Sequence, residues 1–230
     1  AGRALFGSAD GHVYCLRASD GQLVWRFRAA PDDRRIVSEG QLESAWPVCG
    51  SVLVDGGVVY CAAGRSSYLD GGIRLCRIDL ATGRLLKDRV LWSRDPVTGD
   101  QPDEPIMFEM AGALPDVLST DGEHLFMRQL TFDARTLEDQ PVVAHLYSPA
   151  WFLNGDWWHR TYWLHGTHFY SGYIGWYFAG REATAGRILS VDPSSIYGFG
   201  YKPQFYRGAT ERQYHLFAVD RAEQPPQPDP

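Results

Sequence analysis

The densest run of aromatic and cationic residues in this chain is WWHRTYW at positions 157–163. On a strand, alternate side chains point to opposite faces, so Trp157 and His159 share one face while Arg160 and Tyr162 share the other. Histidine beside tryptophan could bind a sugar ring or support a buried acid/base, and arginine with tyrosine could hold a carboxylate or sulfate. We favour a packing role, in which one face lies between neighbouring sheets and the other lines the rim.

A second candidate is the polar loop RSSYLDGG at positions 65–72. Its Arg65, Tyr68 and Asp70 could line a central channel and contact an anionic or sugar ligand, with the flanking glycines providing backbone freedom. Alternatively, Arg65 and Asp70 pair with each other and hold the loop together. The sequence favours neither interpretation, so all three residues are kept as ligand-binding candidates.

Two carboxylates and a tryptophan, Glu39, Glu43 and Trp46, precede the same segment and could lie at the same mouth of the fold. Paired carboxylates perform glycoside chemistry only when they face each other at about 5–10 Å. Spacing along the chain does not give that distance. Trp46 is therefore a ligand-binding candidate, and no residue is assigned as catalytic.

The histidines suggest a metal site only weakly. His165 and His168 have a spacing that some metal sites use, and His159 could lie near them. Two histidines without a third ligand are better explained as exposed residues of a turn, which we expect here. No metal ligand is assigned.

The sequence contains four cysteines, Cys15, Cys49, Cys61 and Cys76. They lack the close spacing of zinc and redox sites. Cys15 and Cys76 occupy the same place in two sequence repeats, where a small buried residue would pack against the next unit. A two-residue turn at positions 55–56 would put Cys49 and Cys61 on opposite faces of a hairpin. We therefore expect free thiols.

Two similar segments, residues 13–25 (VYCLRASDGQLVW) and 75–86 (LCRIDLATGRLL), indicate which elements position these side chains. Each has the pattern of a strand, a turn with glycine and a return strand. Asp-Gly pairs between alternating apolar runs predict hairpins at 10–11, 20–21 and 55–57. Two more diverged units follow within 117–138 and 157–201, and a strand at 214–220 begins a fifth. No long stretch has a 3.6-residue apolar period, so we expect four-stranded antiparallel units and little helix.

Long irregular stretches separate these units, at residues 29–46, 93–112 and 140–155. Loops of this length on a rigid β scaffold are where binding surfaces tend to be built. The net charge of −6 and the absence of a basic tract argue against a nucleic-acid partner. No run approaches the roughly 20 apolar residues of a membrane span. Ala1 is not an initiator methionine, which suggests a removed leader or a longer protein.

Residues 13–25, with the Asp-Gly hairpin before them, resemble the repeat of quinoprotein-like (PQQ-like) β-propellers, in which a tryptophan docks on the neighbouring blade. Trp25 is that tryptophan here, whereas the second repeat has Lys87 in its place. Residues 157–163 and 185–189 resemble large PQQ-like propeller proteins of environmental, often planctomycetal, bacteria.

The resemblance implies a propeller segment over residues 1–220, with four or five blades of a ring of about seven or eight. A disordered Pro-rich tail would follow at 221–230. The missing blades would come from an upstream segment or a second chain, because an open half-ring leaves a sheet edge and a blade face uncovered.

Quinoprotein dehydrogenases of this superfamily hold PQQ over a tryptophan and bind calcium or a lanthanide through Glu, Asn and Asp. Asn154 and Asp156 beside Trp157, together with Glu109, could supply such oxygens, but we favour a polar turn at 154–156. The chain lacks the adjacent cysteines and the haem-attachment motif that many of these enzymes carry. PQQ with calcium is thus poorly supported, and the cofactor is left unassigned.

We therefore expect a non-catalytic, secreted or periplasmic propeller module that binds a protein or glycan and scaffolds assembly. The alternative is an enzyme, either a divergent quinoprotein dehydrogenase with part of its site in the missing blades or a carbohydrate-active propeller. The periplasmic or extracellular compartment follows from the resemblance, because the cysteine usage is neutral on this point.

Overall fold

The computed structural model describes residues 2–38, 40–49, 52–101, 112–148, 163–167, 184–201 and 214–222. Within these residues every regular element is a β-strand, and every pair of bonded strands is antiparallel. The expected all-β class is confirmed. The same residues contain no helix that could cross a membrane.

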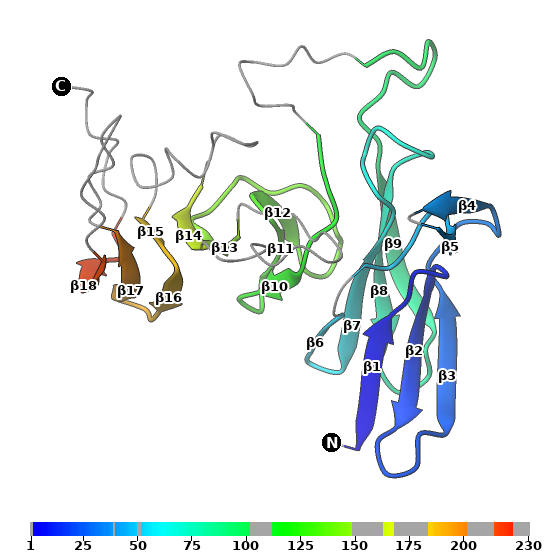
Figure 1. Ribbon diagram of the computed structural model, residues 1–230, viewed down its shortest axis with the longest axis horizontal. Coiled ribbons are helices and arrows are strands. Elements are labelled where there is room, and N and C mark those ends of the chain that lie inside the picture. The colour runs from blue at the N-terminus through cyan, green and yellow to red at the C-terminus, as the bar shows by residue number, and fades with distance from the viewer. Residues whose placement is uncertain are drawn as a thin grey trace. The chain divides into compact units, whose positions relative to one another are not determined.

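The chain divides into two compact units, and unit 1 comprises Ala1–Asp103 and Gly112–Gln140 (Figure 1). Its described residues include three successive up-and-down sheets of three, four and three strands, so the expected four strands are seen in the second of them. The first sheet consists of β1 (Arg3–Gly7), β2 (His12–Arg17) and β3 (Leu23–Arg28). The second consists of β6 (Leu53–Asp55), β7 (Val58–Ala63), β8 (Ile73–Asp79) and β9 (Leu85–Leu91). The third consists of β10 (Leu118–Thr120), β11 (His124–Met127) and β12 (Leu130–Asp133).

These three sheets stack face to face in chain order. One core joins the first sheet to the second through buried side chains that include Val13, Cys15, Trp25, Val59, Cys61, Cys76 and Ile78. A second core joins the other face of the second sheet to the third, through residues that include Tyr60, Leu75, Leu125, Met127 and Phe132. Consecutive antiparallel meanders stacked in this way are built as the blades of a β-propeller, the fold class expected from the sequence.

Trp25 docks on the next sheet, as the resemblance implied. Its indole Nε1 donates a hydrogen bond to the carbonyl oxygen of Leu80 at 3.0 Å. A Cβ atom added to Gly83, in the turn between β8 and β9, would lie 2.7 Å from the indole ring. Gly83 has a φ of +73°, so it also provides the left-handed backbone that this turn needs. The contact fixes the first sheet on the second.

The predicted equivalence of Cys15 and Cys76 is wrong by one residue. The turn hydrogen bonds Gly21 N to Arg17 O and Gly83 N to Asp79 O align the repeats so that Cys15 matches Arg77. A shift of one residue moves a strand side chain to the other face. Cys15 therefore faces the second sheet, whereas Cys76 faces back toward the first, and both lie in the core between them.

All four cysteines are free, as expected. The turn between β6 and β7 differs from the prediction, since its two central residues are Gly56 and Gly57, with φ of +52° and +82°. Two consecutive positive φ values are typical of a type I′ hairpin turn. The resulting register pairs Val54 with Val59.

The stretch at 29–46, expected to be irregular, contains a hairpin made of β4 (Arg35–Ser38) and β5 (Gln41–Ser44). The β-branched residues Ile36 and Val37 lie before Gly40 and Leu42 follows it, and a glycine between two short apolar-containing runs is a signal for a hairpin. The two strands form a separate two-stranded sheet.

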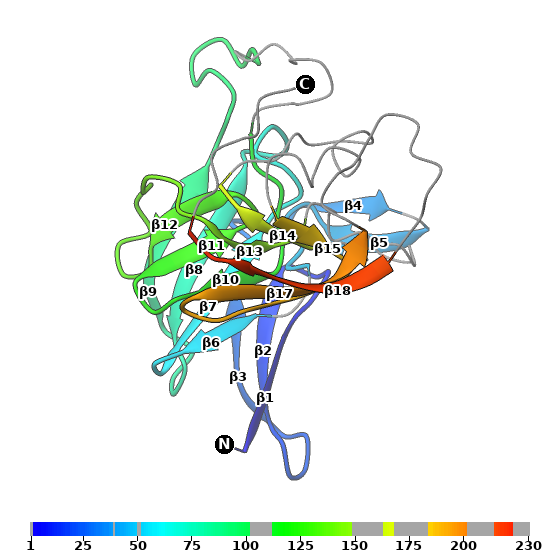
Figure 2. The ribbon, with the colours of Figure 1, turned by 90° about the vertical axis from the view of Figure 1, so that its left-hand side faces the viewer.

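Unit 2 comprises Glu104–Ala111 and Pro141–Pro230. Its described strands form two three-stranded meanders, and the second of them is prominent in Figure 2. The first consists of β13 (His145–Tyr147), β14 (Trp163–Gly166) and β15 (Thr184–Gly186). The second consists of β16 (Ile188–Val191), β17 (Ser195–Tyr201) and β18 (Tyr214–Asp220).

Candidate functional site

The long loops of the first two sheets of unit 1 emerge at one end of these sheets. Because successive strands are antiparallel, the segments that follow β1, β3, β7 and β9 all leave the sheets at this end. Short turns at 18–22, 56–57 and 80–84 occupy the opposite end (Figure 1). We call the end with the long loops the loop-bearing end. Long loops on a rigid scaffold are typical of binding surfaces, so this end is the candidate site.

Backbone hydrogen bonds tie the described loops of this end together. The amides of Ala29 and Ala30 donate to the carbonyl oxygen of Gly11 at 3.0 Å each, and Ser44 N donates to Ala9 O at 2.9 Å. Gly11 has a φ of +84°, and a Cβ atom there would lie 2.7 Å from that of Ala30. The loops therefore form an ordered platform rather than independent chains.

Two of the predicted ligand-binding residues are buried within this platform. Trp46 is 6% exposed and Tyr68 is 5% exposed. The guanidinium of Arg34 lies over the Trp46 ring, 4.7 Å from its centroid, and Ser44 Oγ accepts a hydrogen bond from Trp46 N at 3.1 Å. Stacking of a sugar requires an open ring face, so these aromatic side chains serve the platform instead.

Arg65 and Asp70, the other two predicted residues of this region, do not pair with each other. Arg65 Nη2 lies 2.9 Å from Glu43 Oε2, and Arg34 Nη2 lies 2.6 Å from Asp70 Oδ1. Each pair joins the loop at 64–72 to the segment at 29–46. Arg65 thus pairs with Glu43, while Arg34 contacts both Asp70 and Trp46, and these opposite charges bind the two segments to each other.

Apart from His165 in unit 2, the remaining predicted residues lie outside the described residues. They are the ligand-binding candidates Trp157, His159, Arg160 and Tyr162 and the metal or carboxylate candidates Glu39, Glu109, Asn154, Asp156 and His168. Among the described residues, no group of three histidine, cysteine or carboxylate side chains could hold a metal ion.

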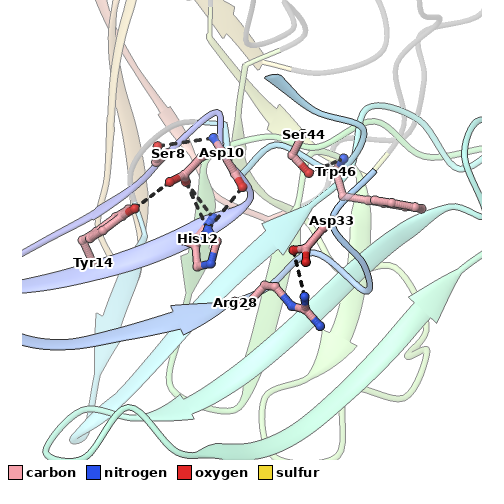
Figure 3. Close-up of polar contacts among 8 residues, drawn as sticks. All are labelled: Ser8, Asp10, His12, Tyr14, Arg28, Asp33, Ser44 and Trp46. Atoms are coloured by element: carbon pink, nitrogen blue, oxygen red, sulfur yellow. Dashed lines mark hydrogen bonds and ion pairs between the residues drawn. The ribbon is translucent and has the colours of Figure 1, made fainter. Parts of the chain in front are cut away.

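A polar cluster at the loop-bearing end, Ser8, Asp10, His12 and Tyr14, was not identified from the sequence (Figure 3). Asp10 Oδ2 accepts a hydrogen bond from Tyr14 OH at 2.5 Å, and Oδ1 accepts one from His12 N at 3.1 Å. Asp10 Oδ1 also lies 3.4 Å from His12 Nδ1. The available signal was the spacing of two residues between Asp10, in the turn before β2, and His12 and Tyr14 of β2, of which the last two share a face.

The cluster holds an ionised carboxylate. Burial raises the pKa of Asp10, but hydrogen bonds from Tyr14, Ser8 and His12 outweigh it and lower the pKa below its ordinary value. The same contact with Asp10 raises the pKa of the Tyr14 phenol. A carboxylate that already accepts several hydrogen bonds is a weak base, so Asp10 provides a fixed negative charge near the loops.

Two strongly exposed apolar side chains of the loop-bearing end lie on the β4–β5 hairpin. Val37 and Leu42 are directly opposite each other across the two strands and are 76% and 63% exposed. Cross-strand neighbours lie close enough to act as one patch. The hairpin is anchored beneath them by the bonds of Ser44 and Glu43 described above.

Cys49 offers a chemical test of this electrostatic arrangement. Burial raises the pKa of its thiol, Glu43 raises it further and Arg65 lowers it. We predict that Glu43→Gln speeds alkylation of Cys49 by iodoacetamide at pH 8, because thiolate content rises roughly tenfold for each unit that the pKa falls. Mass spectrometry would measure the rate, and Asp33→Asn is the matched control. An unchanged rate in Glu43→Gln would contradict the arrangement.

In unit 2, the expectation of exposed turn histidines is wrong for His165, which lies in β14 and is buried. Burial lowers the pKa of His165 below the ordinary value for histidine, and the charges of Arg221 and His145 lower it further. The fold therefore favours the neutral imidazole. The unfolded chain binds the proton more readily, so stability falls as the pH drops below about 6.5.

We predict that the unfolding midpoint of unit 2 falls between pH 7 and pH 5, and that His165→Asn flattens this dependence. Denaturant titration followed by circular dichroism at several pH values would measure it. His124→Asn, in unit 1, controls for the loss of a histidine in general. Equal pH dependence in wild type and His165→Asn would assign the acid sensitivity to other groups.

No protein-family model and no curated protein sequence matches the chain. Solved structures do resemble it. BamB from Moraxella catarrhalis is 15% identical with a TM-score of 0.40, over 85% of this chain and 51% of that one. The quinohemoprotein alcohol dehydrogenase ADHIIG from Pseudomonas putida HK5 is 12% identical with a TM-score of 0.49, over 95% and 46% of the two chains. Saccharomyces cerevisiae Sqt1 is 13% identical with a TM-score of 0.40, over 72% and 39%. This chain spans about half the length of such structures, or less.

Proposed function

We propose that this chain is a partner-binding propeller module that recruits a protein through the loop-bearing end of unit 1. The observation that supports this role is the Val37–Leu42 pair, a strongly exposed apolar patch on an anchored hairpin. Apolar patches that are held rigidly at a surface are favourable contact sites for proteins, because little order has to be gained on binding.

A protein is a better candidate than a glycan for this end. Sugar binding by aromatic stacking needs exposed rings, but Trp46 and Tyr68 are buried under neighbouring loops. The arginines Arg34 and Arg65 are bound to carboxylates of the chain itself, which reduces their availability for an anionic sugar. The glycan and its candidates at 157–162 remain part of the wider proposal of a binding and scaffolding module.

We also propose that the module acts in the periplasm or outside the cell, and that an upstream segment or second chain completes the propeller. The sequence resemblance supports the first part. The stacking of three successive blades in unit 1 supports the proposed completion of the propeller. Each blade in such a stack has two faces to be covered, so the terminal blades need further neighbours.

The experiment is a comparison of partner retention by the full chain and by the double variant Val37→Ser/Leu42→Ser. Envelope and secreted fractions of the source organism and a panel of soluble polysaccharides are passed over each protein, and bound material is quantified by mass spectrometry. We predict retention of a defined protein that weakens about tenfold or more in the variant, because apolar contacts central to an interface dominate affinity.

The control is Val90→Ser, which removes an exposed valine from β9 of the same unit. It should retain the protein as the wild type does. Retention of polysaccharide alone, or of a protein whose binding ignores the double variant, would refute the role assigned to the hairpin.

A further inference from the structure

The first sheet of unit 1 has one buried face and one open face. Val13, Cys15 and Trp25 point into the core with the second sheet. The opposite face carries another row of apolar side chains, Ala4, Phe6, Tyr14 and Leu16, which are exposed or half-buried. Phe6 is 43% exposed and stacks on Tyr14 with 5.4 Å between ring centroids.

In the second sheet, the positions equivalent to this apolar row are covered by a neighbouring sheet. The two sheets have equivalent turns, and both have an irregularity at the same place, between Cys15 and Leu16 and between Arg77 and Ile78. This alignment matches the row Ala4, Phe6, Tyr14 and Leu16 with Val59, Cys61, Cys76 and Ile78. Those four residues are no more than 2% exposed, because the first sheet packs on them.

The tryptophan-docking site is repeated as well. Trp25 occupies the site formed by Gly83 and the carbonyl oxygen of Leu80. The same alignment places Gly21 and the carbonyl oxygen of Ala18 at the equivalent positions of the first sheet. Gly21 has a φ of +72°, against +73° for Gly83, but no atom lies within 4 Å of a Cβ atom built on it. Leu23, equivalent to the partly buried Leu85, is 58% exposed beside it.

We propose that the open face of β1–β3 is the docking surface for a further propeller blade that lies outside residues 1–230 and ends in a docking tryptophan. Its indole would pack on Gly21 and donate to Ala18 O, while its apolar row would cover Phe6 and Tyr14. The occupant is defined by continuity with the interface between the first and second sheets, which repeats the same contacts one blade later. This inference develops the ring-completing partner proposed above and uses a surface other than the β4–β5 hairpin.

A second copy of the chain is a poorer occupant. The tryptophan that docks at this position of a blade, Trp25, is already bound to Gly83 within its own chain. Contact between two identical open faces would bury Phe6 but would leave the Gly21 site empty. The open apolar row and the empty site at Gly21 together therefore favour a further blade with a docking tryptophan over a second copy of this chain.

The test places a photo-crosslinker on the open face through Phe6→p-benzoylphenylalanine in the full chain, expressed in its source cells. We expect crosslinking to a strand outside residues 1–230 whose tryptophan is needed, so that its replacement by alanine lowers the yield about tenfold or more. Gly21→Val should do the same by filling the docking site. Gly57→Val is the matched control, since Gly57 is also a turn glycine with positive φ and open space at Cβ. The mass of the product tells whether the blade belongs to the same polypeptide or a separate one.

Other outcomes overturn the proposal. Crosslinking to β16–β18 of the same chain would mean that the chain closes on itself, and crosslinking to Phe6 of a second copy would mean a dimer. Crosslinking to a segment without the required tryptophan, or the absence of any crosslink in a folded variant, also refutes the proposal. Because the hairpin is unaltered in these variants, the Val37→Ser/Leu42→Ser result remains a separate test of the proposed function.

Discussion

Trp25→Ala is expected to lower the free energy of unfolding of unit 1 by about 3–5 kcal/mol, the usual effect of truncating a large buried aromatic side chain. Trp25 is only 8% exposed and belongs to the core between the first and second sheets. Its removal also loses the indole hydrogen bond to Leu80 O, an oxygen that keeps Arg3 Nη1 as a donor at 2.6 Å, so most of the effect comes from lost packing. Urea unfolding followed by circular dichroism would measure the change.

Substitutions at two turn glycines distinguish the stability due to tryptophan docking from the cost of general backbone strain. Gly83→Ala and Gly21→Ala both place an alanine at a φ near +70°, which costs about 1–2 kcal/mol for a residue with a Cβ atom. Only at Gly83 would the methyl group also meet the Trp25 ring, at 2.7 Å. We therefore expect Gly83→Ala to be clearly the more destabilising of the two in the isolated chain. Equal effects would show that the docking contact contributes little.

Much of this blade interface could be predicted from the sequence, because its signals are local. Asp-Gly and Thr-Gly pairs indicated the turns, and alternation indicated the strands around them. The resemblance of residues 13–25 to the PQQ-like propeller repeat indicated Trp25 as the docking residue. The predicted equivalence of Cys15 and Cys76 was wrong because a shared cysteine does not define the register of two repeats, and a shift of one residue reverses the face of a strand.

The candidate site was predicted in outline and missed in detail. The sequence grouped Arg65 and Asp70 in one loop with Trp46 nearby, and the structure does bring these residues together. Their actual partners, Glu43 and Arg34, lie 22 and 36 residues away along the chain. Pairing over such distances is set by how loops pack, for which spacing gives no information.

The interface between the second and third sheets should respond differently to substitution, because the sequence has Lys87 in place of the docking tryptophan there. Leu137 lies at the position equivalent to Gly83, since Thr136 N bonds Asp133 Oδ1 as Thr82 N bonds Asp79 Oδ1. Leu137 keeps a left-handed φ of +60°, yet its side chain is fully buried in the second core. The hydroxyl of Tyr60 donates to Ala134 O at 2.9 Å, where Trp25 bonds Leu80 O in the first interface.

These contacts suggest that Leu137 and Tyr60 together fill the place of the missing tryptophan. Leu137→Ala should then cost about 2–5 kcal/mol, as for other buried leucines. Leu137→Gly should cost about 1 kcal/mol less than that cavity alone implies, because glycine relieves the left-handed backbone. Thermal and urea unfolding of unit 1 would measure both variants.

The decisive comparison adds a tryptophan at Lys87, the exposed residue that matches Trp25. Lys87→Trp alone should bring no gain, because the Leu137 side chain occupies the docking site. In Lys87→Trp/Leu137→Gly the site is vacated, so the new indole can dock and recover part of the loss. We expect a favourable coupling of about 1 kcal/mol or more between the two changes, measured by a double-mutant cycle. Strictly additive effects of the two changes on the free energy of unfolding would mean that Leu137 does not occupy a tryptophan-docking site. The two blade interfaces would then be built differently.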